Sequence, residues 1–254
     1  MKQEKAYKLL ALQEGISNNE AKELIDSGLV SAGGKRLVLA RGLLNENTSF
    51  KVTKLAKPVM IYEDDNIVAV NKPPFITSEK VAEIFKFPLL NRLDKETSGV
   101  ILLYKNEDFQ KTAIKEFANN KVQKTYLAIV RGIVVDEFSV ELPISTVKMK
   151  SGAFSKIDLS RGKTAITHVS PLMVEGKKSL IKVVIETGRT HQIRCHLAHA
   201  GYGVIGDEKY AKNSSKRVYL HSLETALLGY KFKASPDRSF CDFGFEISNG
   251  ILNS

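Results

Sequence analysis

The sequence has little cysteine and no long apolar run, and these scarcities exclude several classes of protein. Only Cys195 and Cys241 occur among 254 residues, so a disulfide framework cannot hold a chain of this length together. No apolar run approaches the roughly 20 residues that a membrane-spanning helix needs. The opening MKQEK leads into a mixed polar segment rather than the apolar core of a secretory signal. We therefore expect a cytoplasmic protein with no membrane partner.

Internal repeats and low-complexity tracts are also absent, and a composition of 43% hydrophobic and 26% charged residues is typical of globular proteins. Positive charge is what the sequence has in excess. The formal net charge is +10, and residues 1–60 hold 10 Lys and Arg against 6 Asp and Glu. This excess favours a polyanionic partner, since clustered basic side chains release counterions from a phosphate backbone. A merely solvated basic surface is the alternative interpretation.

The first 53 residues predict a small unit of two helices and a hairpin. Ser17 and Glu20 match a capping box, which is typical of the start of a helix, and Gly28 is suited to its end. The glycine pair at 33–34 is typical of a tight turn between two strands. The Lys-rich stretch 54–58 is expected to be a linker. In order, we expect a helix over 5–13, a helix over 18–27, a hairpin over 29–39 and a strand over 50–52.

This pattern, carried by ISNNEAKELIDSGLVSAGGK, resembles the small RNA-binding module called the S-four-like domain. Such modules place their second helix and the following basic hairpin against structured RNA. The resemblance therefore implies RNA contacts by Lys22, Lys35 and Arg36. Helix pairs followed by a hairpin also occur for purely structural reasons, which is the alternative interpretation.

From residue 59 the sequence changes to apolar runs with partial alternation, which predict strands. EDFQKTAIKEFAN fits a helix between two of them. Neighbouring runs are often joined without a full helical crossover, so residues 59–254 predict one α+β domain with mainly antiparallel strands. The predicted strands are VMIYEDD, NIVAVNKPP, VILLYKN, QKTYLAIVRG, AITHVSPLMV and SLIKVVIET.

Several motifs follow one another in this second part, and together they resemble the RluA-type family of RNA pseudouridine synthases over residues 59–225. RLD, followed by TSG and an apolar strand, matches the catalytic loop of that family. GRTHQIR, followed by an apolar helix and GD, matches its C-terminal signature. The resemblance implies a pseudouridine synthase fold with a large bent sheet, and conversion of uridine to pseudouridine in structured RNA. The segments are NKPP, NRLDKETSGVILLYKN, KTYLAIVRG, GKTAITH and ETGRTHQIRCHLAHAGYGVIGDEKYA.

The resemblance implies four site residues. Asp94 would be the nucleophile, Tyr126 would stack on the uracil, and Arg189 would form an ion pair with the nucleophile. A guanidinium favours the ionised carboxylate, and an aromatic face holds a flipped base. Arg92 would occupy the space left by the flipped nucleotide or bind its phosphate. Attack on uracil carbon six, attack on the ribose anomeric carbon and elimination of the base all remain open as routes.

Each of these residues also has a structural interpretation. An Arg-x-Asp sequence is often a surface ion pair. Tyr126 suits the core of a strand, where it alternates with Leu127 and Ile129. Arg189 could pair with Glu186 or Asp207.

A metal site is the alternative for the helix with His191, Cys195 and His199, because spacing by four residues places side chains on one face. We expect no metal there and no cofactor, since the reaction is an isomerisation for which one carboxylate and a closed pocket suffice. A nuclease with two metals is not favoured, because no tight carboxylate cluster is present.

Two departures from the family pattern bear on the RNA target. Asn91 stands where the family commonly has histidine, and residues 75–91 form a shorter segment than expected before Arg92. We expect a monomer that acts on large-subunit ribosomal RNA and does not act on DNA. Transfer RNA is the alternative substrate, and a non-catalytic ribosome-assembly factor is the alternative function.

Overall fold

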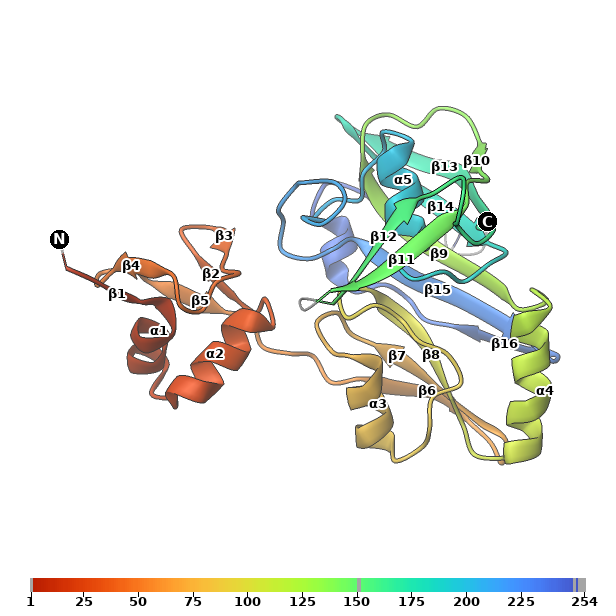
Figure 1. Ribbon diagram of the computed structural model, residues 1–254, viewed down its shortest axis with the longest axis horizontal. Coiled ribbons are helices and arrows are strands. Elements are labelled where there is room, and N and C mark those ends of the chain that lie inside the picture. Colours follow the sequence, from red (N-terminus) through yellow and green to blue (C-terminus); the bar gives the residue numbers. More distant parts are fainter. Residues whose placement is uncertain (1, 150–151, 249, 251–254) are drawn as a thin grey trace. The chain divides into compact units, whose positions relative to one another are not determined.

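The computed structural model describes residues 2–149, 152–248 and 250, and the chain divides into two units. The first unit comprises Met1–Ala56 with Ser214–Lys216, and the second comprises Lys57–Asn213 with Arg217–Ser254. Figure 1 shows both units, and each is described here by itself.

The N-terminal unit contains the two predicted helices and the predicted hairpin. Ser17 caps α2 (Asn18–Asp26) through the predicted box: its hydroxyl accepts from the amide of Glu20, whose carboxylate accepts from the amide of Ser17. Lys35 and Arg36 form strand β3 rather than the turn, and residues 37–39 form no strand. The remaining elements of this unit are β1 (Gln3–Lys5), α1 (Ala6–Glu14), β2 (Val30–Ala32), β4 (Leu43–Asn45) and β5 (Phe50–Val52).

A nine-stranded sheet forms the second unit, in the order β10-β13-β14-β9-β15-β8-β7-β6, with β16 paired to β15. Neighbouring strands run antiparallel except for β15 and β8, which are parallel. The predicted α+β fold with a large, mainly antiparallel sheet is therefore confirmed. The strands are β6 (Val59–Glu63), β7 (Ile67–Lys72), β8 (Ser98–Tyr104), β9 (Gln123–Arg131), β10 (Phe138–Val140), β13 (Thr167–Glu175), β14 (Lys178–Ile185), β15 (Leu220–Leu227) and β16 (Tyr230–Lys233).

Helices α3, α4 and α5 and a separate two-stranded hairpin accompany this sheet in the described part of the second unit (Figure 1). Helix α4 (Glu107–Ala118) matches the predicted helix, while α3 (Ser78–Phe85) lies in the short segment for which we predicted no element. Helix α5 (Gln192–His199) contacts β12 and β13. The hairpin pairs β11 (Ile144–Met149) with β12 (Gly152–Ile157), and a 3-10 helix covers Arg238–Cys241.

Strand β9 is buried on both faces of the sheet, which explains its nearly continuous apolar sequence. Tyr126, Ala128 and Val130 belong to one core cluster, to which α5 contributes Ile193 and Leu197. Leu127 and Ile129 belong to a second cluster on the other face. Because successive strand residues point to opposite faces, a strand covered on both sides has little polar alternation. No described helix is long and apolar enough to cross a membrane.

Candidate active site

The segment that leads into Asp94 is held by side-chain hydrogen bonds at two positions, Asn91 and Leu93. The Asn91 carboxamide oxygen accepts from the backbone amide of Leu102 at 2.8 Å, which ties the start of the loop to β8. The Ser78 hydroxyl, at the first residue of α3, donates to the carbonyl of Leu93 and accepts from its amide. The short 75–91 segment therefore braces the loop directly, and Asn91 anchors it where the family pattern has histidine.

Lys72, the lysine of the NKPP segment, also binds the backbone of this loop. Its side chain is fully buried, and Nζ donates to the carbonyls of Ile76 at 2.7 Å and Lys95 at 3.2 Å. Burial lowers the pKa of Lys72 to about 7. A buried amine that satisfies backbone carbonyls fixes the segments to which they belong. One side chain thus connects the backbone before α3, at Ile76, to the Asp94 loop itself, at Lys95.

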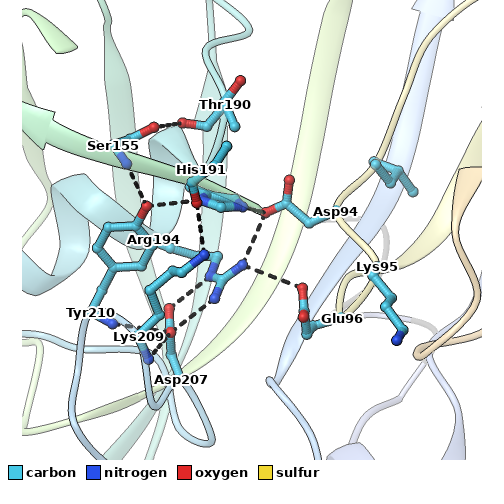
Figure 2. Close-up of polar contacts among 12 residues, drawn as sticks. Asp94, Lys95, Glu96, Ser155, Thr190, His191, Arg194, Asp207, Lys209 and Tyr210 are labelled. Carbon is cyan, nitrogen blue, oxygen red and sulfur yellow. Dashed lines mark hydrogen bonds and ion pairs between the residues drawn. The ribbon is translucent and has the colours of Figure 1, made fainter. Parts of the chain in front are cut away.

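Arg194, rather than Arg189, forms the ion pair with Asp94. Arg194 Nη1 lies 3.2 Å from Asp94 Oδ2, and the Asp94 side chain is 22% exposed (Figure 2). Arg189 is half-buried, and its Nε donates to the carbonyl of Thr164. The prediction for Arg189 is therefore corrected: it precedes α5, whereas Arg194 lies inside that helix on the face directed to the loop.

A bidentate ion pair with Asp207 fixes the Arg194 guanidinium. Nε and Nη2 of Arg194 lie 2.7 and 2.9 Å from the two carboxylate oxygens of Asp207, a fully buried residue. Glu96 lies 3.5 Å from Nη1. Burial opposes the charge of Arg194, but the hydrogen bonds and charge of Asp207, with those of Asp94 and Glu96, raise its pKa above the usual value. The guanidinium is therefore held rigidly as a cation beside Asp94.

Tyr126 lies on β9 near Asp94, with its side chain largely buried. The residue is 9% exposed, and Leu93 of the Asp94 loop packs against its core cluster. Burial raises the pKa of Tyr126 to about 12, and the charge of Asp94 acts in the same direction. Two of the four predicted site residues, Asp94 and Tyr126, therefore lie in one region of the second unit. Tyr126 also belongs to the hydrophobic core.

Arg92 and Arg189 lie at the surface of the second unit. Arg92 Nη2 forms an exposed ion pair with Glu79 at 2.6 Å. The charge of Arg189 adds to burial in lowering the pKa of Lys124 to about 8, which places Arg189 near the start of β9.

The predicted RNA-binding residues of the N-terminal unit lie on α2 and the β2–β3 hairpin. Lys22 Nζ lies 4.5 Å from the centroid of the Tyr7 ring, Lys35 is exposed, and Arg36 is half-buried.

Sequence reasoning missed Arg194, although the sequence held a signal for it. Six successive residues of α5, from Gln192 to Leu197, are buried, so an arginine among them needs an acidic partner. Asp207, in the GD element, is that partner.

The sequence did not predict the contact of His191 with Asp94, in which Nε2 lies 3.8 Å from Oδ2. His191 lies at the N-cap of α5 in the left-handed region rather than within the helix. Among the described residues, no group of three His, Cys, Asp or Glu side chains could hold a metal ion.

Comparisons with known proteins agree with this geometry. A family model described as RNA pseudouridylate synthase matches residues 66–199, which contain Asp94, Tyr126 and Arg194. An uncharacterized RNA pseudouridine synthase of Helicobacter pylori strain J99 is 52% identical over 241 residues, covering 93% of this chain and 99% of that protein. The ribosomal large subunit pseudouridine synthase C of Rickettsia bellii is 33% identical over 190 residues, covering 66% of this chain and 63% of its own.

The fold has a solved counterpart. The structure of human RNA pseudouridylate synthase domain containing 1 superposes with a TM-score of 0.63 at 22% identity, covering 74% of this chain and 86% of that one. Since the family match covers more than half of the chain and the relative from Helicobacter pylori spans nearly all of it, this chain belongs to the RNA pseudouridylate synthase family and is an isomerase.

Proposed function

We propose that Asp94 is the nucleophile with which this enzyme converts uridine to pseudouridine in large-subunit ribosomal RNA, without a cofactor. The reaction breaks the bond between uracil nitrogen one and the ribose anomeric carbon. It then forms a bond from that ribose carbon to uracil carbon five, whose proton leaves while nitrogen one gains a proton. Atoms and electrons balance within the isomerisation, so no oxidant or reductant is consumed.

The ion pair between Asp94 and Arg194 is the observation that carries this proposal. A nucleophilic carboxylate must be ionised and partly accessible, and Asp94 is 22% exposed beside a guanidinium at 3.2 Å. The guanidinium is oriented by the buried carboxylate of Asp207, so it cannot turn away without leaving that carboxylate unpaired. A cation fixed in this way favours the charged form of Asp94.

Tyr126 is proposed to form one wall of the uracil site. Its ring lies on a central strand, and its burial keeps the phenol protonated, with a pKa of about 12. A neutral aromatic ring beside the nucleophile can stack on a flipped base and exclude water from it. Arg92, which is exposed, and Arg189, which is half-buried, are proposed to contact RNA phosphates near this site.

The RNA target is inferred from relatives and from charge. Relatives from Rickettsia bellii and Zymomonas mobilis are named ribosomal large subunit pseudouridine synthases C and D. We further propose that the N-terminal unit is an S-four-like domain that binds structured RNA through Lys22, Lys35 and Arg36. Two helices and a basic hairpin support this assignment. The enzyme is proposed to act as a cytoplasmic monomer.

Chemical mapping of pseudouridine tests the proposed function directly. Ribosomal and transfer RNA would be compared from cells that lack the gene and from the same cells carrying the wild-type gene or Asp94→Asn. We expect at least one site in large-subunit ribosomal RNA to vanish on deletion and to return only with the wild type. Loss of a transfer RNA site instead would overturn the ribosomal assignment. Full restoration of the pseudouridine by Asp94→Asn would overturn the assignment of Asp94 as the nucleophile.

A further inference from the structure

A chain of polar contacts leads from strand β12 to Asp94 and is not used by the mechanism above (Figure 2). The backbone amide of Ser155 donates to the Tyr210 hydroxyl at 2.8 Å. That hydroxyl lies 2.7 Å from Nδ1 of His191, and Nε2 of the same imidazole lies 3.8 Å from Asp94 Oδ2. The His191 side chain is only 10% exposed. Its two ring nitrogens therefore face two defined groups.

The partners of the imidazole decide which nitrogen carries the proton. A lone pair on Nε2 would face the Asp94 carboxylate and be repelled, whereas a proton on Nε2 is attracted to it. The Tyr210 hydroxyl can donate its own proton to Nδ1 while it accepts from the Ser155 amide. Both contacts favour the tautomer with the proton on Nε2. His191 thus presents an N–H group to Asp94.

The charges around the imidazole allow it to remain neutral at neutral pH. Burial lowers the pKa of His191, and the cations of Arg194 and Lys209 add to this effect. The carboxylates of Asp94 and Glu96 oppose it without reversing the direction. A neutral ring can accept from Tyr210 and donate toward Asp94 at the same time, which an imidazolium cannot do.

The backbone at His191 is strained, which is typical of functional positions. Its φ of 52° and ψ of 22° lie in the left-handed region, which residues with a side chain adopt only at a cost in conformational energy. His191 is the N-cap of α5, yet its side chain makes no capping hydrogen bond. Instead, the side chain is directed to Tyr210 and Asp94.

The contacts of the Asp94 carboxylate are confined to one oxygen. Within the described residues, the side-chain ion pairs and hydrogen bonds of Asp94 all involve Oδ2, which faces Arg194 Nη1 and His191 Nε2. A carboxylate held through one oxygen presents the other to its surroundings. Oδ1 is thereby left for the substrate.

We propose that His191 is a positioning residue of this active centre: held by Tyr210, it directs Nε2–H to Asp94 Oδ2 and, together with Arg194, turns Oδ1 toward the uridine. This inference rests on the proposed role of Asp94 as nucleophile. It also connects the β11–β12 hairpin to the nucleophile, because Tyr210 is held by the Ser155 amide and stacks on Phe154 of the same strand.

Two matched pairs of variants test the inference in the full-length enzyme. His191→Leu removes the donor, and His191→Gln keeps an N–H group of similar reach on the same strained backbone. Tyr210→Phe removes the hydroxyl that holds the ring. Tyr202→Phe is its control, because Tyr202 packs against Phe138 and the core cluster, away from this chain of contacts. Turnover would be followed by tritium release from RNA labelled at uracil carbon five, together with thermal melting of each variant.

We expect His191→Leu to lower kcat by about 10- to 100-fold with little change in KM, since misplacing a reacting group costs rate rather than binding. Tyr210→Phe should lower kcat in the same way, while His191→Gln recovers most of the lost rate and Tyr202→Phe retains full rate. Wild-type kcat in a folded His191→Leu variant would overturn the inference. If that variant does not fold, equal kcat values for Tyr210→Phe and Tyr202→Phe would overturn it instead. Failure of the proposed function would give a different result, namely full turnover by Asp94→Asn.

Discussion

Arg194 is the residue on which the charges of the site converge. Its guanidinium contacts Asp94, Glu96 and Asp207, and its side chain is only 5% exposed. A buried cation shared among carboxylates stabilises little overall compared with apolar packing, but it is costly to remove one partner alone. Arg194 therefore links the stability of the second unit to the charge of Asp94, the proposed nucleophile.

Replacing this guanidinium should destabilise the protein as well as inactivate it. We expect Arg194→Gln to lower the free energy of unfolding by about 3–5 kcal/mol, because the buried Asp207 carboxylate loses its bidentate partner. Urea denaturation followed by circular dichroism measures this loss. Arg189→Gln is the matched control: Arg189 is half-buried and bonded to a backbone carbonyl rather than to a buried carboxylate, so its loss should cost no more than about 1 kcal/mol. Equal stability of the two variants would contradict the assigned ion pair.

At the scale of elements, strand β8 directly follows the Asp94 loop, and the second residue of this strand, Gly99, has to be glycine. Gly99 has a φ of +111°, and a Cβ there would lie 2.1 Å from the carbonyl oxygen of Ser222. That carbonyl belongs to β15, the one strand that pairs parallel to β8. The close approach of the two backbones fixes where β8 begins, and hence where the loop ends.

A side chain at position 99 should therefore separate two central strands. We expect Gly99→Ala to lower the free energy of unfolding by about 3 kcal/mol, since backbone atoms must move and the positive φ is strained. Gly176→Ala provides the comparison, because φ is +56° there and no atom lies within 4 Å of the added carbon, so only about 1 kcal/mol of strain is expected. Denaturant titration of both variants would show the difference. A Gly99→Ala variant no less stable than Gly176→Ala would refute the close approach.

Elements with a local signal could be predicted from the sequence, and those without one could not. The capping box of Ser17 and Glu20 and the apolar runs of β8 and β9 are local patterns, and the structure contains each element. The β11–β12 hairpin was missed because residues 146–149 are all exposed, which leaves no alternation between buried and exposed positions.

At the site, too, a local pattern was not sufficient: the sequence did not show whether Arg189 or Arg194 forms the ion pair with Asp94. Both arginines belong to GRTHQIR, and the motif alone does not say which one reaches a loop about 100 residues earlier in the chain. The start of α5 decides this, because it leaves Arg189 before the helix and buries Arg194 within it. The prediction for Asp94, by contrast, depends on the RLD motif itself and on no distant partner.

At the scale of the whole molecule, the net charge of +10 suits an enzyme whose substrate is a polyanion. Residues 1–60, most of which form the N-terminal unit, carry +4 of this charge, and the groups described around Asp94 all belong to the second unit. If the N-terminal unit binds RNA, neutralising one of its phosphate contacts should weaken binding without altering the chemistry.

The salt dependence of RNA binding tests this division of roles. We expect Lys35→Gln, at an exposed position of the β2–β3 hairpin, to lower RNA affinity and to reduce the slope of log affinity against log salt by about 0.7–0.9, as for one lost phosphate contact. Lys111→Gln serves as the control, because Lys111 is an exposed lysine on α4 that pairs with Asp108. Filter binding at several salt concentrations gives both slopes. Identical slopes for the two variants would count against RNA binding through the hairpin.

The most direct test of the central claim is release of tritium from RNA labelled at uracil carbon five, measured over many turnovers with purified Asp94→Asn enzyme. Each pseudouridine formed releases the label, because carbon five exchanges its proton for a bond to the ribose. Asp108→Asn, on the exposed surface of α4, is the matched control. We predict that Asp94→Asn binds RNA but releases no tritium above background, while Asp108→Asn releases it at the wild-type rate. Release by Asp94→Asn at the wild-type rate would contradict the assignment of Asp94 as the nucleophile.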